Sequence, residues 1–206
     1  MTRIVVADDQ ALIRSAVAAM LLLEDDLDVV GQAGDCGEAL RVVTETQPDV
    51  CLLDVQMPAG GLDIEDGIGV IPLIRAASPG TRILMVTTFG RPGYLRRALE
   101  AGAAGFMVKD SPADELIEGV RRVAQGLRVV DAELAAASLN LGSSPLTEKE
   151  ADVLEAAAGG ASTSEIARRV HLSEGTVRNY LSSAIGKLGA RNRAEAISVA
   201  TDNGWL

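Results

Sequence analysis

The stretch "IVVADDQ", Ile4 to Gln10, places two adjacent carboxylates directly after a short apolar run. The run has the length of a buried strand, so Asp8 and Asp9 stand where that strand ends. Two like charges side by side raise each other's pKa and resist burial. The pair therefore indicates a bound cation, whose other ligands should lie elsewhere in the chain.

The first 125 residues alternate short apolar runs with amphipathic stretches. The apolar runs lie at 3–7, 28–33, 49–54, 82–88 and 104–109, and the amphipathic stretches lie near 10–23, 36–46, 67–77, 92–102 and 112–125. Five strands that alternate with five helices predict an α/β fold with a doubly wound, five-stranded parallel sheet. The strands are almost entirely apolar, which is typical of a sheet covered on both faces.

Polar residues gather at the predicted strand ends, namely Asp8 and Asp9, Asp54, Thr87 and Lys109. Parallel strands bring these ends to one edge of the sheet, where the sites of such folds lie. Hard oxygen ligands suit Mg²⁺. We expect Asp9 and Asp54 to bind the ion directly and Asp8 to bind it through a water molecule.

The same constellation predicts phosphoryl chemistry. Asp54 is the candidate nucleophile that becomes an acyl phosphate. Thr87 would donate a hydrogen bond to the phosphoryl group and Lys109 would neutralise it, while the backbone carbonyl of Gln56 completes the metal ligands. Ordinary polar strand ends are the alternative, which fits any one of these residues but not the whole set.

The motifs "DD", "LLDVQMP", "VTT" and "VKDSP" resemble the receiver domain of two-component response regulators, a flavodoxin-like (CheY-like) fold, from Arg3 to about Gln125. The resemblance implies a sensor histidine kinase as the partner that phosphorylates the chain. It also implies roles for six residues: Asp54 as phosphoacceptor, Asp8 and Asp9 as acidic metal site, Thr87 as switch hydroxyl, Lys109 as phosphoryl-binding lysine and Phe106 as switch aromatic.

One departure from the receiver pattern is an insert, "AGGLDIE" at 59–65, between the "MP" motif and Asp66-Gly67. It is roughly five residues longer than usual and lies beside the expected pocket. We expect it to slow or alter phosphorylation. The alternative is an atypical regulator that works without phosphorylation because the insert modifies the pocket.

A phosphatase is a further alternative, because haloacid-type phosphatases also phosphorylate an aspartate at a strand end. Those enzymes have a second aspartate two residues later as general acid, and this chain has Gln56 there. The acyl phosphate should therefore persist. We expect no enzymatic activity beyond self-phosphorylation and dephosphorylation at Asp54.

The charge of the chain is uneven. The total is −10, but residues 145–206 contain 7 Lys/Arg and 8 Asp/Glu and are nearly neutral. The segment "RVVDAELAAASLNLGSSP" loses the strand–helix alternation, and a capping box, Thr147 with Glu150, follows it. We therefore predict a receiver domain at 1–126, a linker at 127–145 and a second domain at 146–206.

The second domain has the layout of a helix-turn-helix. "STSEIARRV" and "SEGTVRNYLSSAIGKLG" are amphipathic and flank the short turn "HLS". The second helix turns Arg178, Asn179 and Ser182 outward, and Arg and Asn read guanine and adenine edges in the major groove. Phosphate contacts are expected from four further residues: Thr176, Lys187, Arg191 and Arg193.

The stretch at about 147–197 resembles the LuxR/NarL-type helix-turn-helix. Together with the receiver motifs, it identifies the chain as a response regulator of the NarL/FixJ type with a C-terminal all-α domain. The near-neutral charge predicts weak DNA binding by a monomer, so we expect a homodimer, formed on phosphorylation, to bind double-stranded promoter DNA. A four-helix domain that only dimerises is the alternative.

The composition excludes several other classes of protein. The chain is 48% hydrophobic and 23% charged, which is sufficient for a packed core. No apolar run reaches membrane-spanning length, and the N-terminus has no signal-peptide pattern, so we expect a cytoplasmic protein. Cys36 and Cys51 lack metal-site spacing and are predicted to be reduced, buried thiols.

Overall fold

The structure is a computed structural model that describes residues 1–64, 66–88, 90–131, 134–136, 138 and 144–206. The chain divides into two compact units, each of which is described by itself below. The first consists of Met1–Gly90 and Leu95–Ala135, and the second consists of Arg91–Tyr94 and Ala136–Leu206. The last passage of the chain from the first unit to the second, between Ala135 and Ala136, falls within residues 127–145.

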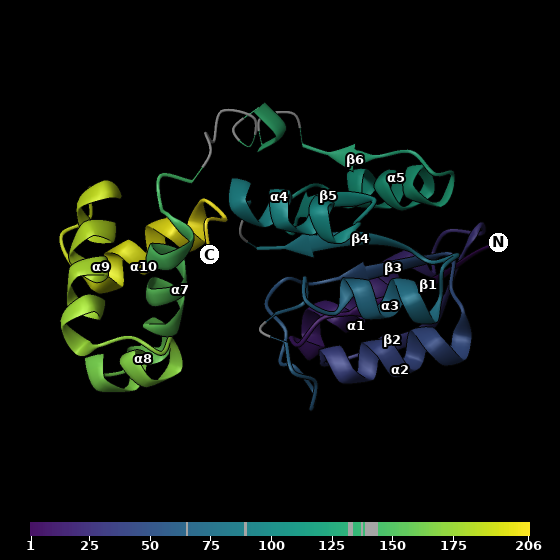
Figure 1. Ribbon diagram of the computed structural model, residues 1–206. Helices are drawn as coiled ribbons and strands as arrows, with labels where there is room; N and C mark the ends of the chain where they lie inside the picture. The colour runs from purple at the N-terminus through teal and green to yellow at the C-terminus, as the bar shows by residue number, and fades with distance from the viewer. Residues whose placement is uncertain (65, 89, 132–133, 137, 139–143) are drawn as a thin grey trace. The chain divides into compact units, whose positions relative to one another are not determined.

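The first unit contains a parallel sheet in which the strands run in the order β2-β1-β3-β4-β5-β6 (Figure 1). The strands are β1 (Thr2–Ala7), β2 (Leu27–Ala33), β3 (Val50–Leu53), β4 (Arg82–Thr87), β5 (Gly105–Val108) and β6 (Val129–Val130). The predicted doubly wound parallel sheet is confirmed, with one strand more than the five expected. The extra strand, β6, lies in the predicted linker and has only two residues, too few to give a recognisable apolar run.

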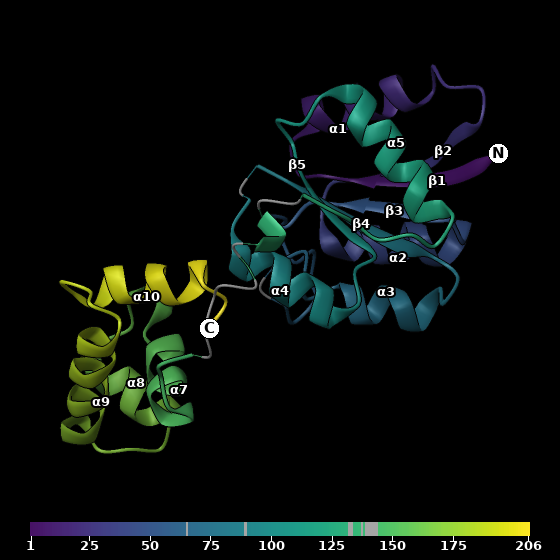
Figure 2. The ribbon, with the colours of Figure 1, turned by 90° about the horizontal axis from the view of Figure 1, so that it is seen from above.

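The helices of this unit lie on both faces of the sheet. They are α1 (Ala11–Leu21), α2 (Cys36–Thr46), α3 (Ile71–Ala77), α4 (Pro92–Ala101) and α5 (Ala113–Ala124). In Figure 2, α1 and α5 lie on one side of the strands, and α3 and α4 lie on the other. This arrangement explains why the strands alternate with amphipathic stretches in the sequence.

The predicted helix over 67–77 is wrong at its start, because α3 begins only at Ile71. The carboxylate of Asp66 accepts the N–H groups of Ile68 and Gly69 at 2.9 and 3.1 Å, which holds the chain in a turn. The N–H of Gly67 donates to the carbonyl of Val55 at 2.8 Å, which ties this turn back to the end of β3. Side-chain bonds of this kind compete with helix formation.

Among the described residues, the core between the sheet and the helices α1 and α5 is aliphatic apart from Met107 and the half-buried Met20. Ile4, Val6 and Leu84 on the strands pack with Leu21 of α1 and Val120 of α5. The intervening strand residues, such as Leu53 and Met85, are fully buried as well. Burial on both faces is the reason why the strands read as unbroken apolar runs.

The second unit is built from helices α7 (Glu148–Ala156), α8 (Thr163–Arg169), α9 (Glu174–Lys187) and α10 (Arg193–Asp202), with a 3₁₀ turn at Ala158–Gly160. Each helix begins at a side chain that accepts an N–H from three residues later: Thr147, Ser162, Ser173 and Asn192. The predicted capping box at Thr147 and the predicted N-cap at Ser173 are therefore confirmed.

The two cysteines have the state that the sequence predicts. Cys36 and Cys51 are free and buried, as predicted, and burial raises their pKa values to about 11 and about 12.

Within the described ranges, none of the helices combines the length and the apolar character needed to cross a membrane.

We predict that Leu84→Ala lowers the free energy of unfolding of the first unit by about 2–5 kcal/mol. Leu84 is fully buried in β4, inside the sheet, so the truncation leaves a cavity. Urea titration followed by circular dichroism measures the loss. The matched control is Leu73→Ala on α3, because the Leu73 side chain is 40% exposed, and it should cost less than about 1 kcal/mol. Equal losses for the two variants would contradict this placement of the core.

Candidate functional site

Four neighbouring strands, β1, β3, β4 and β5, present polar residues at their carboxyl ends. Asp8 and Asp9 follow β1, Asp54 follows β3, Thr87 ends β4 and Lys109 follows β5. The four strands are consecutive in the sheet, so their ends form one edge. The sequence predicts that these residues share a cleft, because all the strands are parallel.

The ammonium group of Lys109 lies between two buried carboxylates. Its Nζ is 2.7 Å from Oδ2 of Asp8 and 2.8 Å from Oδ2 of Asp54. The exposed fractions of the three side chains are only 8% for Lys109, 7% for Asp8 and 2% for Asp54. Asp8 is also fixed by the N–H of Gln10, which donates to its Oδ1 at 2.9 Å.

Three carboxylates meet at this edge of the sheet. One oxygen from each of Asp8, Asp9 and Asp54 lies within 4.8 Å of the others. Lys109 compensates one of these negative charges, so the cluster has the donor set and the residual charge that suit a divalent cation with oxygen ligands. The residues present therefore fit Mg²⁺.

The charges in the pocket shift the protonation equilibria of Asp54 and Lys109. Burial raises the pKa of Asp54, and the hydrogen bond and charge of Lys109 oppose this only in part. Burial lowers the pKa of Lys109, but hydrogen bonds to Asp54 and Asp8 outweigh this and raise it above its ordinary value. Lys109 thus remains a cation inside the pocket.

The other predicted pocket residues differ in exposure. Thr87 is fully buried, and its carbonyl accepts the N–H of Lys109 at 2.7 Å, which holds the ends of β4 and β5 together. Phe106 is fully buried in β5, opposite Met85 of β4. Gln56 is exposed, and its N–H points to Oδ1 of Asp54 at 3.4 Å.

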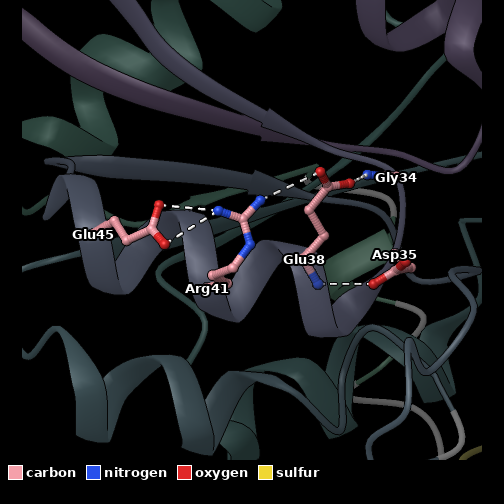
Figure 3. Close-up of polar contacts among 5 residues, drawn as sticks. All are labelled: Gly34, Asp35, Glu38, Arg41 and Glu45. Carbon is pink, nitrogen blue, oxygen red and sulfur yellow. Dashed lines mark hydrogen bonds and ion pairs between the residues drawn. The ribbon is translucent and has the colours of Figure 1, made fainter.

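The start of α2 is closed by its own side chains (Figure 3). Asp35 accepts the N–H of Glu38 at 2.8 Å, and Oε2 of Glu38 accepts the N–H of Gly34 at 2.8 Å. On the helix surface, Arg41 bridges Glu38 and Glu45 at 3.6 and 3.0 Å. These bonds give the insert that follows β3 a fixed surface to pack on.

The insert is anchored at this helix start. The carbonyl of Pro58 accepts the N–H of Cys36 at 2.9 Å. Gly60 has a φ of +62°, and a Cβ atom there would lie 2.0 Å from Oδ1 of Asp35. A Cβ atom on Gly37 would likewise lie 2.2 Å from the carbonyl oxygen of Gly60. Only glycine permits this close approach of the insert to α2.

Asp66, which directly follows the insert, contacts a different helix. Oδ2 of Asp66 pairs with Arg97 of α4 at 3.1 Å. A Cβ atom on Gly67 would lie 1.9 Å from the carbonyl oxygen of Asp54, so the chain here touches the backbone of the candidate phosphoacceptor. Glu65 lies outside the described residues. Among the described carboxylates, none from the insert joins the cluster of Asp8, Asp9 and Asp54.

In the second unit, α8 and α9 form the predicted helix pair. Between them His171 adopts a left-handed conformation with a φ of 53°, and the N–H of Leu172 donates to the carbonyl of Ala167 at 3.0 Å. This closure terminates α8 in the way that a glycine usually does. His171, which is exposed, serves the turn through its backbone.

The surface of α9 is divided as its sequence indicates. Val177, Leu181 and Ala184 are buried in the core of this unit. Arg178, Asn179 and Ser182 are exposed, while Thr176 is half-buried and its hydroxyl lies 2.8 Å from that of Ser173. The predicted base-reading residues thus lie on the outer surface of α9.

The predicted phosphate-binding cations have partners inside the unit. Lys187 pairs with Glu150 at 2.6 Å, and Arg191 pairs with Glu195 at 3.0 Å. Nη1 of Arg193 donates to the carbonyl of Ala161 at 2.7 Å. The sequence identifies these residues by their charge alone, and it does not reveal the carboxylates and the carbonyl group that they contact.

Glu150 has a second role that the sequence analysis missed. Besides the capping box, its Oε1 accepts the hydroxyl of Ser183 at 2.6 Å. Hydrogen bonds from Lys187 and Ser183, together with the N–H of Thr147, lower the pKa of Glu150 to about 2. The spacing of Ser183 and Lys187, one helical turn apart, is the signal that could have indicated a shared partner.

Two family models match this chain. The model described as "Response regulator receiver domain" matches residues 4–121. The model described as "Bacterial regulatory proteins, luxR family" matches residues 144–200. Between them they cover both units.

Proteins of known name resemble the chain over its whole length. The transcriptional regulatory protein DesR of Bacillus subtilis (strain 168) is 40% identical over 207 residues, which is 100% of each chain. The response regulator RamR of Streptomyces coelicolor is 41% identical over 205 residues, 100% of this chain and 98% of that one. Among solved structures, the crystal structure of the response regulator ChrA of a heme-sensing two-component system superposes with a TM-score of 0.58. The match covers 100% of this chain and 98% of that one, with 30% sequence identity.

We predict that acid unfolds the second unit partly through Glu150. The folded-state pKa is about 2, below the ordinary glutamate pKa of 4.5, so the carboxylate contributes stability above pH 4.5 and loses it as the pH falls towards 2. The contribution is at most about 3 kcal/mol. Thermal unfolding of wild type and Glu150→Gln between pH 7 and pH 2 measures it. The two curves should converge at low pH, and a constant difference would contradict the prediction.

Proposed function

Because the chain belongs to the response regulators of the luxR (NarL/FixJ) family, we propose that it is a transcriptional regulator switched by phosphorylation of Asp54. A sensor histidine kinase is the proposed phosphodonor. Double-stranded promoter DNA is the proposed ligand of the second unit, which matches the luxR-type model. The single observation that carries the proposal is the bridge from Lys109 to Asp8 and Asp54.

The proposed chemical step is phosphoryl transfer from a phosphohistidine to Asp54. A carboxylate oxygen forms the new P–O bond while the P–N bond breaks, and its electron pair stays on the imidazole, which leaves as a neutral ring when its other nitrogen carries a proton. Asp8, Asp9, Asp54 and the carbonyl of Gln56 would hold Mg²⁺. When bound, the ion supplies charge neutralisation for the carboxylates and the incoming phosphoryl group.

Lys109 and Thr87 contribute from the chain itself. Lys109 already holds Asp54 in place at 2.8 Å, and its positive charge can neutralise a phosphoryl oxygen at the same position. Thr87, at the adjacent strand end, is the proposed hydrogen-bond donor to that group. Phe106, buried in β5 opposite β4, is proposed to respond when the hydroxyl moves.

The phosphorylation-independent alternative is not favoured. The receiver model matches almost the whole of the first unit, and the pocket keeps three carboxylates and a lysine together despite the insert. The phosphatase alternative lacks an acid at Gln56, and the named relatives are transcriptional regulators. We therefore propose no enzymatic activity beyond the chemistry of the acyl phosphate.

We propose that the insert slows phosphorylation rather than preventing it. The two residues that flank it, Pro58 and Asp66, bond to α2 and α4, so the insert forms a fixed part of the rim of the receiver. Asp63 is exposed on this rim and repels anionic phosphodonors. Such a rim is a local electrostatic barrier and leaves the pocket itself intact.

The proposed homodimer interface is the exposed side of α1. Its exposed side includes Leu12, which is 83% exposed, together with Ala16 and Ala19, and Leu23, also 83% exposed, lies just after the end of the helix at Leu21. Leu12, Ala16 and Ala19 follow each other at helical spacing and, together with Leu23, form an exposed apolar stripe. A second copy of the chain would cover the stripe, and dimerisation would place two DNA-binding units on adjacent half-sites.

We predict that beryllofluoride, a phosphoryl analogue, converts the wild-type protein from monomer to dimer in the presence of Mg²⁺. Size-exclusion chromatography with light scattering measures the mass. Asp54→Ala should remain monomeric, because the ligand for the analogue is lost, and removal of Mg²⁺ with a chelator should abolish the change in wild type. A treated Asp54→Ala variant that dimerises as wild type does would contradict the proposal.

We predict that deletion of Gly60–Ile64 raises the rate of phosphorylation by acetyl phosphate about 2- to 5-fold, the effect of removing one exposed charge interaction and a fixed rim. Mass spectrometry of the intact protein over time gives the rate. Asp63→Asn is the matched control, because it removes the charge and keeps the loop. An unchanged rate after the deletion would remove the proposed role of the insert.

A further inference from the structure

The carboxylate of Glu150 connects the start of α7 with the C-terminal end of α9. Its Oε2 accepts the ammonium of Lys187 at 2.6 Å and the N–H of Thr147 at 2.7 Å. Its Oε1 accepts the hydroxyl of Ser183 at 2.6 Å. The carboxylate is only 5% exposed, so it is a buried charge that depends on these donors.

Lys187 lies on a different side of α9 from two of the three proposed base-reading residues, Arg178 and Ser182. Successive residues of an α-helix are rotated by about 100°, so Lys187 is turned about 180° from Arg178 and about 140° from Ser182, but only about 80° from Asn179. Ser183, one turn before Lys187, shares its side and also contacts Glu150. The side of α9 that holds Lys187 therefore faces α7, and the exposed Arg178 and Ser182 lie away from it.

We propose that Lys187 is a positioning residue, which together with Glu150 fixes the orientation of α9, and that it is not a phosphate contact. This inference rests on the proposed DNA-binding function of the second unit. The positive charge of Lys187 was the reason to predict a contact with DNA phosphate, and the contact with Glu150 gives this residue a different role. The residues that it positions are Arg178, Asn179 and Ser182.

The burial of Glu150 makes the pair more than a surface contact. Glu150 is buried, whereas the side chain of Lys187 is 36% exposed. Loss of the lysine leaves a buried carboxylate with only two remaining donors, which is costly. The pair of Arg191 and Glu195 differs, because the Arg191 side chain is 86% exposed and such pairs contribute little.

The two roles of Lys187 make opposite predictions for its partner. If Lys187 contacts phosphate, Glu150 competes with DNA for the ammonium group, and Glu150→Gln should tighten binding. If Lys187 positions α9, Glu150→Gln should weaken binding. A phosphate contact also contributes to the dependence of affinity on salt, whereas a positioning residue does not.

The test uses the full-length protein and a duplex that the wild type selects from a random-sequence pool. Fluorescence anisotropy gives the dissociation constant over a range of KCl concentrations. Lys187→Gln and Glu150→Gln should each weaken binding about 3- to 10-fold, with an unchanged slope of log affinity against log salt, and the double variant should be no weaker than the weaker single one. Lys187→Arg should restore most of the affinity.

Two outcomes would overturn the proposal. One is a salt slope for Lys187→Gln that is smaller by about 1, and the other is tighter binding by Glu150→Gln. Arg191→Gln is the matched control for the loss of a paired cation near the same end of α9, and it should leave the thermal unfolding midpoint of the second unit unchanged.

A measurement without DNA separates this proposal from the proposed function. Trp205 is the only tryptophan, and it packs against the core of the second unit, so its fluorescence reports the unfolding of that unit. Glu150→Gln and Lys187→Gln should be strongly non-additive in the unfolding midpoint. If no duplex is enriched but the coupling is present, the DNA-binding function fails and the Glu150–Lys187 contact stands. Additive midpoints would overturn the contact itself.

Discussion

The first unit depends on one interaction, the insertion of the Lys109 ammonium between the buried carboxylates of Asp8 and Asp54. Without a cation, these carboxylates could not stay charged at the edge of a covered sheet. With only one ammonium among three carboxylates, negative charge remains. The pocket is thus held together by one fixed cation and retains an attraction for a second, which is the condition that a magnesium-dependent phosphoryl acceptor requires.

The parallel sheet makes this arrangement possible. Consecutive strands β1, β3, β4 and β5 end at the same edge, so residues separated by a hundred positions in the chain reach one cleft. The core beneath is aliphatic and fixes the strand ends in register. The insert tolerates its extra length because a glycine lets it lie against α2, and the chain that follows it meets the backbone of Asp54 at Gly67.

Much of this could be predicted from the sequence, because periodicity and strand-end chemistry carry strong signals. The order of elements and the gathering of Asp8, Asp54 and Lys109 follow from parallel strands alone. The start of α3 could not be predicted, since the Asp66 side chain captures the N–H groups of Ile68 and Gly69, which a helical pattern does not reveal. The Glu150 contacts were missed because they join helices that are distant in sequence.

The central claim is that the converged strand ends accept a phosphoryl group on Asp54 with the aid of a divalent cation. Peptide mapping by mass spectrometry, after incubation with acetyl phosphate and Mg²⁺, tests it most directly. The account predicts one phosphoryl group, on the peptide that contains Asp54, and none when a chelator is present. A phosphoryl group on another residue, or one on Asp54 that forms equally well without the metal, would contradict it.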